Sequence, residues 1–244
     1  MRTASRMPKI YLNAAKQATH NLLRNPLLIG SSIAAYLALI VLAQLFGGMG
    51  FAGGMVVGLA QVVLLAYYFS WLQDISNGVR LNLSEMLKLD YQLLSAVINA
   101  AFIIYIALFI VQQLIQGMQL ERVLIVLQLF IILVFNALPE SIYIGRYDGM
   151  SALSESANFT KNRWIEWYLP LLVILLPWIV ISPLGVLMTL SSSEALMPCL
   201  KIVFQAAGLI GALAGLPVII STLLGVVVVN WFMLFRAELY RQLT

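Results

Sequence analysis

The sequence contains one cysteine, Cys199, and one histidine, His20. A single cysteine cannot form an intrachain disulfide, and one residue of each kind is too few for a Cys/His metal cluster. Glycine-rich phosphate loops, histidine-based metal motifs and nucleophile elbows are also missing from the sequence. We therefore expect a protein that is not an enzyme and needs no cofactor.

Charged residues are scarce as well, at 10% of the chain against 62% hydrophobic residues, and the mean hydropathy is +0.96. These values lie far outside the range of soluble domains. The net charge of +4 comes from cations at the edges of apolar segments. Anionic lipid headgroups suit that placement better than nucleic acid does. The composition thus predicts an integral membrane protein with membrane lipids as partners and no nucleic-acid binding.

Six long apolar segments with uncharged centres organise the chain. Each is close to or above the ~20 residues that a helix needs to cross a bilayer core, where lipid offers the backbone no hydrogen-bond partner. They cover residues 27–46, 52–72, 91–114, 123–138, 164–190 and 202–235. This pattern predicts an all-α polytopic transmembrane bundle of six spans over residues 27–244, preceded by a cytoplasmic segment over residues 1–26.

The sixth segment is too long for a simple span, since its residues would extend for about 50 Å at ~1.5 Å per residue. It contains Gly215 and Pro217 near its middle. Proline removes a backbone donor and tends to kink a helix. A single kinked span and a re-entrant turn therefore both remain open for residues 202–235.

Lysine and arginine are concentrated in alternate connections. Of the 14 such residues, 12 lie before the first span, after the second, after the fourth or after the sixth. Because cytoplasmic loops are enriched in these residues, both termini are predicted to be cytoplasmic in a multi-pass plasma (inner) membrane protein. The first apolar run begins only at Leu27 and is too long for a cleaved signal peptide, so we expect it to remain in the mature protein.

Three stretches that precede spans carry apolar residues on one helical face. These residues are Tyr11, Ala14, Ala15, Ala18 and Leu22 before the first span, Leu83, Met86 and Leu87 before the third, and Met150, Leu153, Ala157 and Trp164 before the fifth. Each pattern predicts an amphipathic helix on the cytoplasmic membrane surface. The stretches also align weakly with one another, which favours three repeats of a surface helix and a two-span hairpin. Chance alignment of basic helices is the alternative.

Charged and polar residues of the cytoplasmic side are the predicted contacts with lipid headgroups or with a membrane or cytoplasmic protein partner. The candidates are Lys9, Lys16, Arg24, Glu140, Arg146, Asp148, Glu155, Asn158, Lys161 and Arg163. Small residues at four-residue spacing let helix backbones approach closely in lipid. The predicted packing positions are Gly50, Gly54, Gly58, Gly211 and Gly215.

The stretch that follows Pro139 and Glu140 has a distinctive pattern. It contains a glycine, an Ala-Leu-x-x-Ser helix and a Thr-Lys-Asn-x-Trp turn, which run from Gly149 to Trp164 and lead into the fifth span. This pattern resembles a broad group of bacterial six-helix inner-membrane proteins, which includes the membrane domain fused to some glycerophosphodiester phosphodiesterases. The resemblance implies a plasma-membrane helical bundle, usually of unknown activity. It transfers no catalytic residue, because the phosphodiesterase chemistry belongs to a separate soluble domain.

Two functions from different classes remain. The first is a structural, lipid-contacting or partner-binding role in the bacterial cell envelope. The second is a transporter or permease subunit in which the helix over residues 149–161 couples to a soluble motor. Polar residues inside the six segments are all uncharged, which disfavours an ion-coupled carrier and favours the first function. A phospholipid-processing site at Glu140, Arg146 and Asp148 is disfavoured, because charges border the spans of any membrane bundle.

Overall fold

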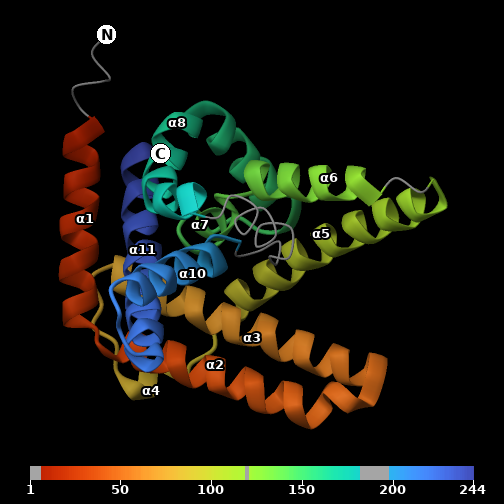
Figure 1. The fold of residues 1–244 in the computed structure, drawn as a ribbon, viewed down its shortest axis with the longest axis horizontal. Helices are drawn as coiled ribbons and strands as arrows, with labels where there is room; N and C mark the ends of the chain where they lie inside the picture. Colours follow the sequence, from red (N-terminus) through yellow and green to blue (C-terminus); the bar gives the residue numbers. More distant parts are fainter. Residues whose placement is uncertain (1–6, 119–120, 182–197) are drawn as a thin grey trace.

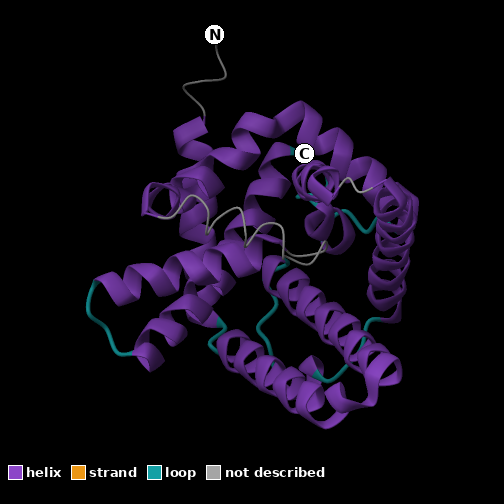
Figure 2. Cartoon of the chain, turned by 45° about the vertical axis from the view of Figure 1, so that its right-hand side comes forward, coloured by secondary structure: helices purple, strands orange, loops and turns teal. Residues whose placement is uncertain are grey.

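The computed structural model describes residues 7–118, 121–181 and 198–244. Their regular secondary structure is helical and includes no strand, as the all-α prediction requires (Figure 2). The elements are α1 (Met7–Arg24), α2 (Leu27–Phe46), the 3-10 helix η1 (Gly47–Met49), α3 (Gly50–Ser76), α4 (Leu83–Met86), α5 (Tyr91–Met118), α6 (Glu121–Val134), α7 (Leu138–Tyr143), α8 (Gly149–Ile181), α10 (Pro198–Leu213) and α11 (Val218–Leu243).

Three helical stretches of the described residues are long and apolar enough to cross a membrane: Leu27–Ser76, Tyr91–Val111 and Val218–Leu243. The first is a hairpin, because η1 separates α2 from α3 and the two long helices run back along each other (Figure 1). Gly50 allows the reversal with a φ of 60°, a conformation that glycine adopts readily. The chain therefore has the helices of a membrane-associated protein, and the number of six spans stays a prediction.

Helix α1 lies beside the C-terminal half of α11 and runs antiparallel to it (Figure 1). Ala14 and Ala18 are fully buried, and the Trp231 indole N–H donates to the Thr19 hydroxyl at 3.0 Å. Two alanines one turn apart offer little side-chain bulk, so the helices approach closely. The predicted apolar stripe of α1 is thus covered largely by protein instead of lying on lipid.

The sixth apolar segment forms two helices. α10 ends at Leu213 and α11 begins at Val218, and the two pack along each other. The turn contains Gly215 with a φ of 71°, followed by Pro217 just before α11. A continuous kinked span over residues 202–235 is therefore excluded, and the glycine and proline mark a reversal of the chain.

Helix α8 is interrupted at Arg163, which has a non-helical φ of −127° and ψ of 24°. The interruption falls where the fifth apolar segment is predicted to begin. In the half before it, Ala152, Ser156 and Phe159 are buried, whereas Met150 is 68% exposed. The predicted apolar stripe of this half is confirmed at Leu153, which is buried, and wrong at Met150 and Trp164, which are exposed. The buried face is therefore rotated about the helix axis from the predicted one and takes in the small polar side chain of Ser156.

The largest buried side chains gather where α3, α7 and α11 meet. The Phe69 and Tyr143 rings lie 5.2 Å apart between centroids, and the Phe159 and Tyr240 rings lie 4.5 Å apart. Aromatic pairs at these separations contribute ~0.5–1.5 kcal/mol beyond the area they bury. This core fixes the ends of α7, α8 and α11, from which the polar side chains of the next section project.

Candidate functional site

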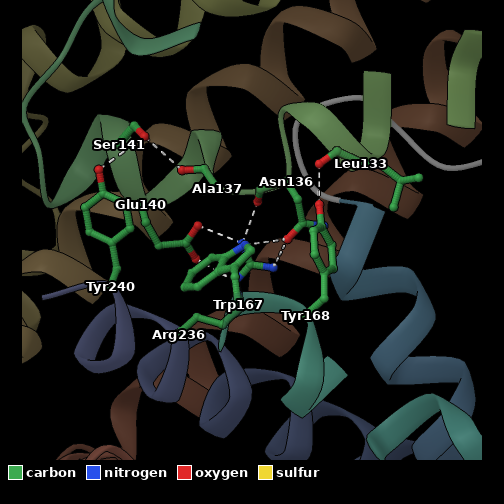
Figure 3. A network of polar contacts seen from close by, with 9 residues as sticks. All are labelled: Leu133, Asn136, Ala137, Glu140, Ser141, Trp167, Tyr168, Arg236 and Tyr240. Atoms are coloured by element: carbon green, nitrogen blue, oxygen red, sulfur yellow. Dashed lines mark hydrogen bonds and ion pairs between the residues drawn. The ribbon is translucent and has the colours of Figure 1, made fainter. Parts of the chain in front are cut away.

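A buried ion pair joins α7 to α11 (Figure 3). Arg236 donates through Nε to Glu140 Oε1 at 2.8 Å and through Nη2 to Glu140 Oε2 at 2.7 Å. The Glu140 side chain is 0% exposed and the Arg236 side chain 5%. Burying a charge is costly unless it is paired and hydrogen-bonded, and this two-point geometry satisfies both charges.

Asn136 extends the pair to α8 (Figure 3). Its side-chain oxygen accepts from Arg236 Nη1 and from the Trp167 indole N–H, both at 3.0 Å. The Arg236 guanidinium also lies 4.6 Å from the centroid of the Trp167 ring, in cation–π geometry. The Glu140–Arg236 network therefore holds α7, α8 and α11 together with the turn after α6.

Its chemistry is structural, because each charge is already engaged by the other. The nearby Tyr143 hydroxyl is buried and has no hydrogen-bond partner among the described residues. Burial, together with the Glu140 carboxylate, raises the pKa of Tyr143 well above its ordinary value, so this hydroxyl stays protonated. Nothing in this arrangement offers an accessible base or nucleophile.

The sequence prediction is wrong for Glu140, which it places among the lipid or partner contacts. A fully buried carboxylate cannot serve as a surface contact. The sequence prediction places Arg236 in the cytoplasmic connection after the sixth segment, although α11 continues through it to Leu243. The available signal is that Arg236 follows an apolar run without a helix breaker and is itself followed by apolar residues at helical spacing, Leu239, Tyr240 and Leu243.

A second polar site is a cavity of about 410 Å³ between the start of α5 and the connection from α7 to α8. Arg146 and Asp148, both predicted contact residues, line it together. Its other polar or aromatic lining residues are Tyr91, Gln92, Ser95 and Tyr147. Sites for small ligands have volumes of about 300–1,000 Å³, so the cavity is large enough for a small polar group.

Arg146 has a φ of 58°, in the left-handed region that few side chains adopt. The connection is tight: a Cβ atom at Gly145 would lie 2.7 Å from the Ser141 carbonyl oxygen, which itself accepts from the Tyr147 N–H at 3.1 Å. A left-handed arginine costs roughly 1–2 kcal/mol, and such strain is concentrated at functional sites. The chain therefore holds Arg146 in place at an energetic cost.

Both charges that line this cavity take part in hydrogen bonds. Arg146 Nη1 lies 2.8 Å from Asp90 Oδ2, and Asn99 Nδ2 donates to the two carboxylate oxygens of Asp148 at 3.0 and 3.2 Å. Asp90 Oδ1 also accepts from the N–H groups of Gln92 and Leu93, which caps α5. Burial alone would raise the pKa of Asp90, but Arg146 and the two N–H donors outweigh it and lower that pKa.

The remaining predicted contact residues lie apart from the cavity. Lys9, Lys16 and Arg24 are exposed on α1, and Asn158 and Lys161 are exposed on α8. Glu155 and Arg163 are half-buried, and Arg163 lies 4.0 Å from Glu166. The structure thus brings Arg146 and Asp148 together, buries Glu140 and leaves the other candidates on two separate helices.

Of the predicted packing glycines, Gly211 makes the expected close contact within the chain. A Cβ atom there would lie 2.7 Å from the Ser221 hydroxyl oxygen on α11. A Cβ at any of the other four would meet nothing within 4 Å, so the packing contacts predicted for Gly50, Gly54, Gly58 and Gly215 are not made among the residues that the structure describes. Gly50 and Gly215 instead provide positive φ angles at turns.

No group of three metal-ligating His, Cys, Asp or Glu residues occurs in the part of the chain that the structure describes. Family models, curated proteins and solved structures give no match to the chain. The resemblance carried by Gly149 to Trp164 therefore stays a prediction. What the site itself offers is a rigid buried network, a cavity with both signs of charge, and an exposed polar face on α8.

Proposed function

We propose that the chain is a non-catalytic integral membrane protein of the bacterial cell envelope that docks a protein partner on its cytoplasmic side. The proposal includes cytoplasmic termini and six spans, the sixth of them formed by α11 in place of the whole stretch over residues 202–235. Its support is the presence of three helical stretches apolar enough to cross a membrane and the placement of 12 of the 14 lysines and arginines in alternate connections.

One observation carries the docking role: α8 presents a polar stripe away from the core. The α8 stripe consists of Ser151, Glu155, Asn158 and Asn162, of which three are exposed and Glu155 is half-buried. Carboxylate and amide groups at this spacing lie on one helical face and offer both donors and acceptors to a partner. Leu153, Ser156 and Thr160 on the opposite side of the helix are buried.

The half of α8 that carries the stripe packs on the core through Phe159, whose ring lies 4.5 Å from the Tyr240 ring and 5.1 Å from the Trp167 ring between centroids. Just beyond the break at Arg163, Trp167 is held by Asn136 and Arg236. The Tyr11 hydroxyl also donates to the Glu166 carbonyl oxygen at 2.9 Å. A surface that is already ordered loses less conformational entropy when a partner binds, so its contacts contribute more to affinity.

A second candidate function is a permease subunit that couples to a soluble motor. The break in α8 at Arg163 favours it, because the exposed half and the apolar half of one helix meet there. Motion of a docked motor would reach the apolar half directly. A partner with ATPase activity that copurifies in fixed stoichiometry would favour this function over simple docking.

The test is affinity purification in mild detergent from cells that express the wild type or the double variant Glu155→Lys, Asn158→Lys. Its matched control is Ser84→Lys, Glu85→Lys, which makes the same charge change at exposed positions of α4. We expect a stoichiometric partner that the α8 variant loses and the α4 variant keeps. A partner retained by both variants, or lost by both, would refute docking at the α8 stripe.

A further inference from the structure

The cavity at the start of α5 carries opposite charges on neighbouring residues. Arg146 and Asp148 both line it, and their side chains come from one short connection between α7 and α8. Guanidinium groups bind phosphate through paired N–H donors, and a carboxylate accepts hydrogen bonds from an ammonium group. Charge complementarity therefore indicates a ligand that carries a phosphate and an ammonium group close together.

The arginine is accessible to such a ligand. Its side chain is 46% exposed, and the ion pair with Asp90 joins only Nη1 to the carboxylate in the structure. A guanidinium has five N–H donors, more than this single contact uses. Asp90 and Asp148 together outweigh the charge of Arg146, so the surroundings disfavour a ligand with a net negative charge.

The cavity adjoins an apolar surface of α5. Tyr91 lines the cavity and is 76% exposed. About two, three and four turns further on, Ile98, Phe102 and Tyr105 share its helical face and are exposed. This face belongs to a stretch that is apolar enough to cross a membrane. Exposed tyrosine at the end of such a stretch is typical of the membrane–water interface.

We propose that this cavity binds the headgroup of a zwitterionic phospholipid with a primary ammonium group. Arg146 contacts the phosphate, Asp148 accepts from the ammonium, and the acyl chains lie along the exposed face of α5. Asn99 holds the Asp148 carboxylate in place through its two hydrogen bonds. The inference rests on the membrane insertion proposed above and does not use the α8 stripe.

Three variants separate this role from a structural one. Arg146→Asn removes the guanidinium but keeps a residue that tolerates the left-handed conformation. Asp148→Asn removes the negative charge and keeps an amide that accepts hydrogen bonds before α8. Asp90→Asn breaks the same ion pair as Arg146→Asn, retains an N-cap residue for α5, and leaves both proposed ligand contacts intact.

The experiment is native mass spectrometry of the full chain in detergent, titrated with phosphatidylethanolamine, phosphatidylcholine or phosphatidylglycerol of identical acyl chains. We expect the wild type to bind phosphatidylethanolamine about tenfold more tightly than the other two, because only its headgroup satisfies both side chains. Arg146→Asn and Asp148→Asn should each remove about tenfold of that affinity or more. Asp90→Asn and the α8 double variant should retain it.

Four results would overturn the inference. The first is equal affinity for all three lipids, and the second is tighter binding of phosphatidylglycerol. The third is the same loss in Asp90→Asn as in Arg146→Asn, which would assign the effect to the ion pair. Free phosphoethanolamine that binds as tightly as the lipid would also overturn it, because the acyl chains of a membrane lipid would then contribute nothing to the affinity. Loss of the α8 partner with lipid binding intact would separate this inference from the docking proposal.

Discussion

The buried ion pair gives the sharpest prediction about stability. Glu140→Gln keeps the shape of the side chain but removes its charge, so Arg236 stays buried without its counterion. Loss of one partner of a buried pair costs ~3–5 kcal/mol, because the remaining charge has no solvent to compensate it. Asn136 still accepts from Arg236 after the substitution and reduces the loss, so we expect a cost near the lower end of that range.

Thermal unfolding in detergent, followed by loss of the monodisperse peak in size-exclusion chromatography, measures this cost. For chains of this size 1 kcal/mol shifts the midpoint by ~2–4 °C, so Glu140→Gln should lower it by about 6–12 °C. Asp90→Asn breaks the partly exposed ion pair with Arg146, worth ~0–1 kcal/mol, and serves as the control.

A double-mutant cycle completes this test. Glu140→Met with Arg236→Met replaces both charges by apolar side chains, and such replacements of buried pairs are often neutral. The double variant should therefore unfold at a higher temperature than Glu140→Met alone or Arg236→Met alone. A Glu140→Gln midpoint within 1 °C of the wild type, or a double variant that loses the sum of both single losses, would refute the account of the network.

Three further predictions concern the connection between α7 and α8 and the start of α5. Because the fold lowers the pKa of Asp90, the contribution of its ionised carboxylate to stability is fully present above the ordinary aspartate pKa of ~3.9 and is lost as the pH falls through the lowered value. The thermal midpoint should therefore drop less between pH 7 and pH 3 in Asp90→Asn than in the wild type. An equal drop in both would contradict this. Arg146→Gly should be more stable than Arg146→Ala by roughly 1 kcal/mol in the free energy of unfolding and should unfold at a higher temperature, because both lose the ion pair and only glycine adopts the φ of 58° without strain. Gly145→Ala should destabilise the chain by ~1–3 kcal/mol, since its Cβ would meet the Ser141 carbonyl oxygen at 2.7 Å, whereas Gly54→Ala, with nothing within 4 Å, should be nearly neutral in the same thermal assay.

Hydrophobic patterning predicted the helical class because the backbone of an apolar segment has to satisfy its own hydrogen bonds. It also placed a boundary near residue 164, where the polar half of α8 meets its apolar half and the helix breaks at Arg163. Amphipathicity identified the apolar face of α1 at Ala14 and Ala18. It could not tell whether lipid or α11 covers that face, because both are apolar.

The Glu140–Arg236 pair could not be predicted in the same way. Its partners are 96 residues apart, and only the packing of α7 on α11 brings them together. Each charge also borders an apolar segment, where a solvated helix end is the common interpretation. The turn after α10 was easier to anticipate, since Gly215 and Pro217 interrupt the apolar run, whereas average hydropathy treats residues 202–235 as continuous.

The proposed function depends on a protein partner that docks on the α8 stripe. Site-specific photocrosslinking in living cells tests it most directly, with a photoreactive residue at Asn158 and, as control, at Ser84 of α4, both of which are exposed. We expect one discrete protein adduct at Asn158 that disappears when Glu155→Lys is added, and no such adduct at Ser84. No protein adduct at Asn158, or the same adduct at both positions, would contradict it.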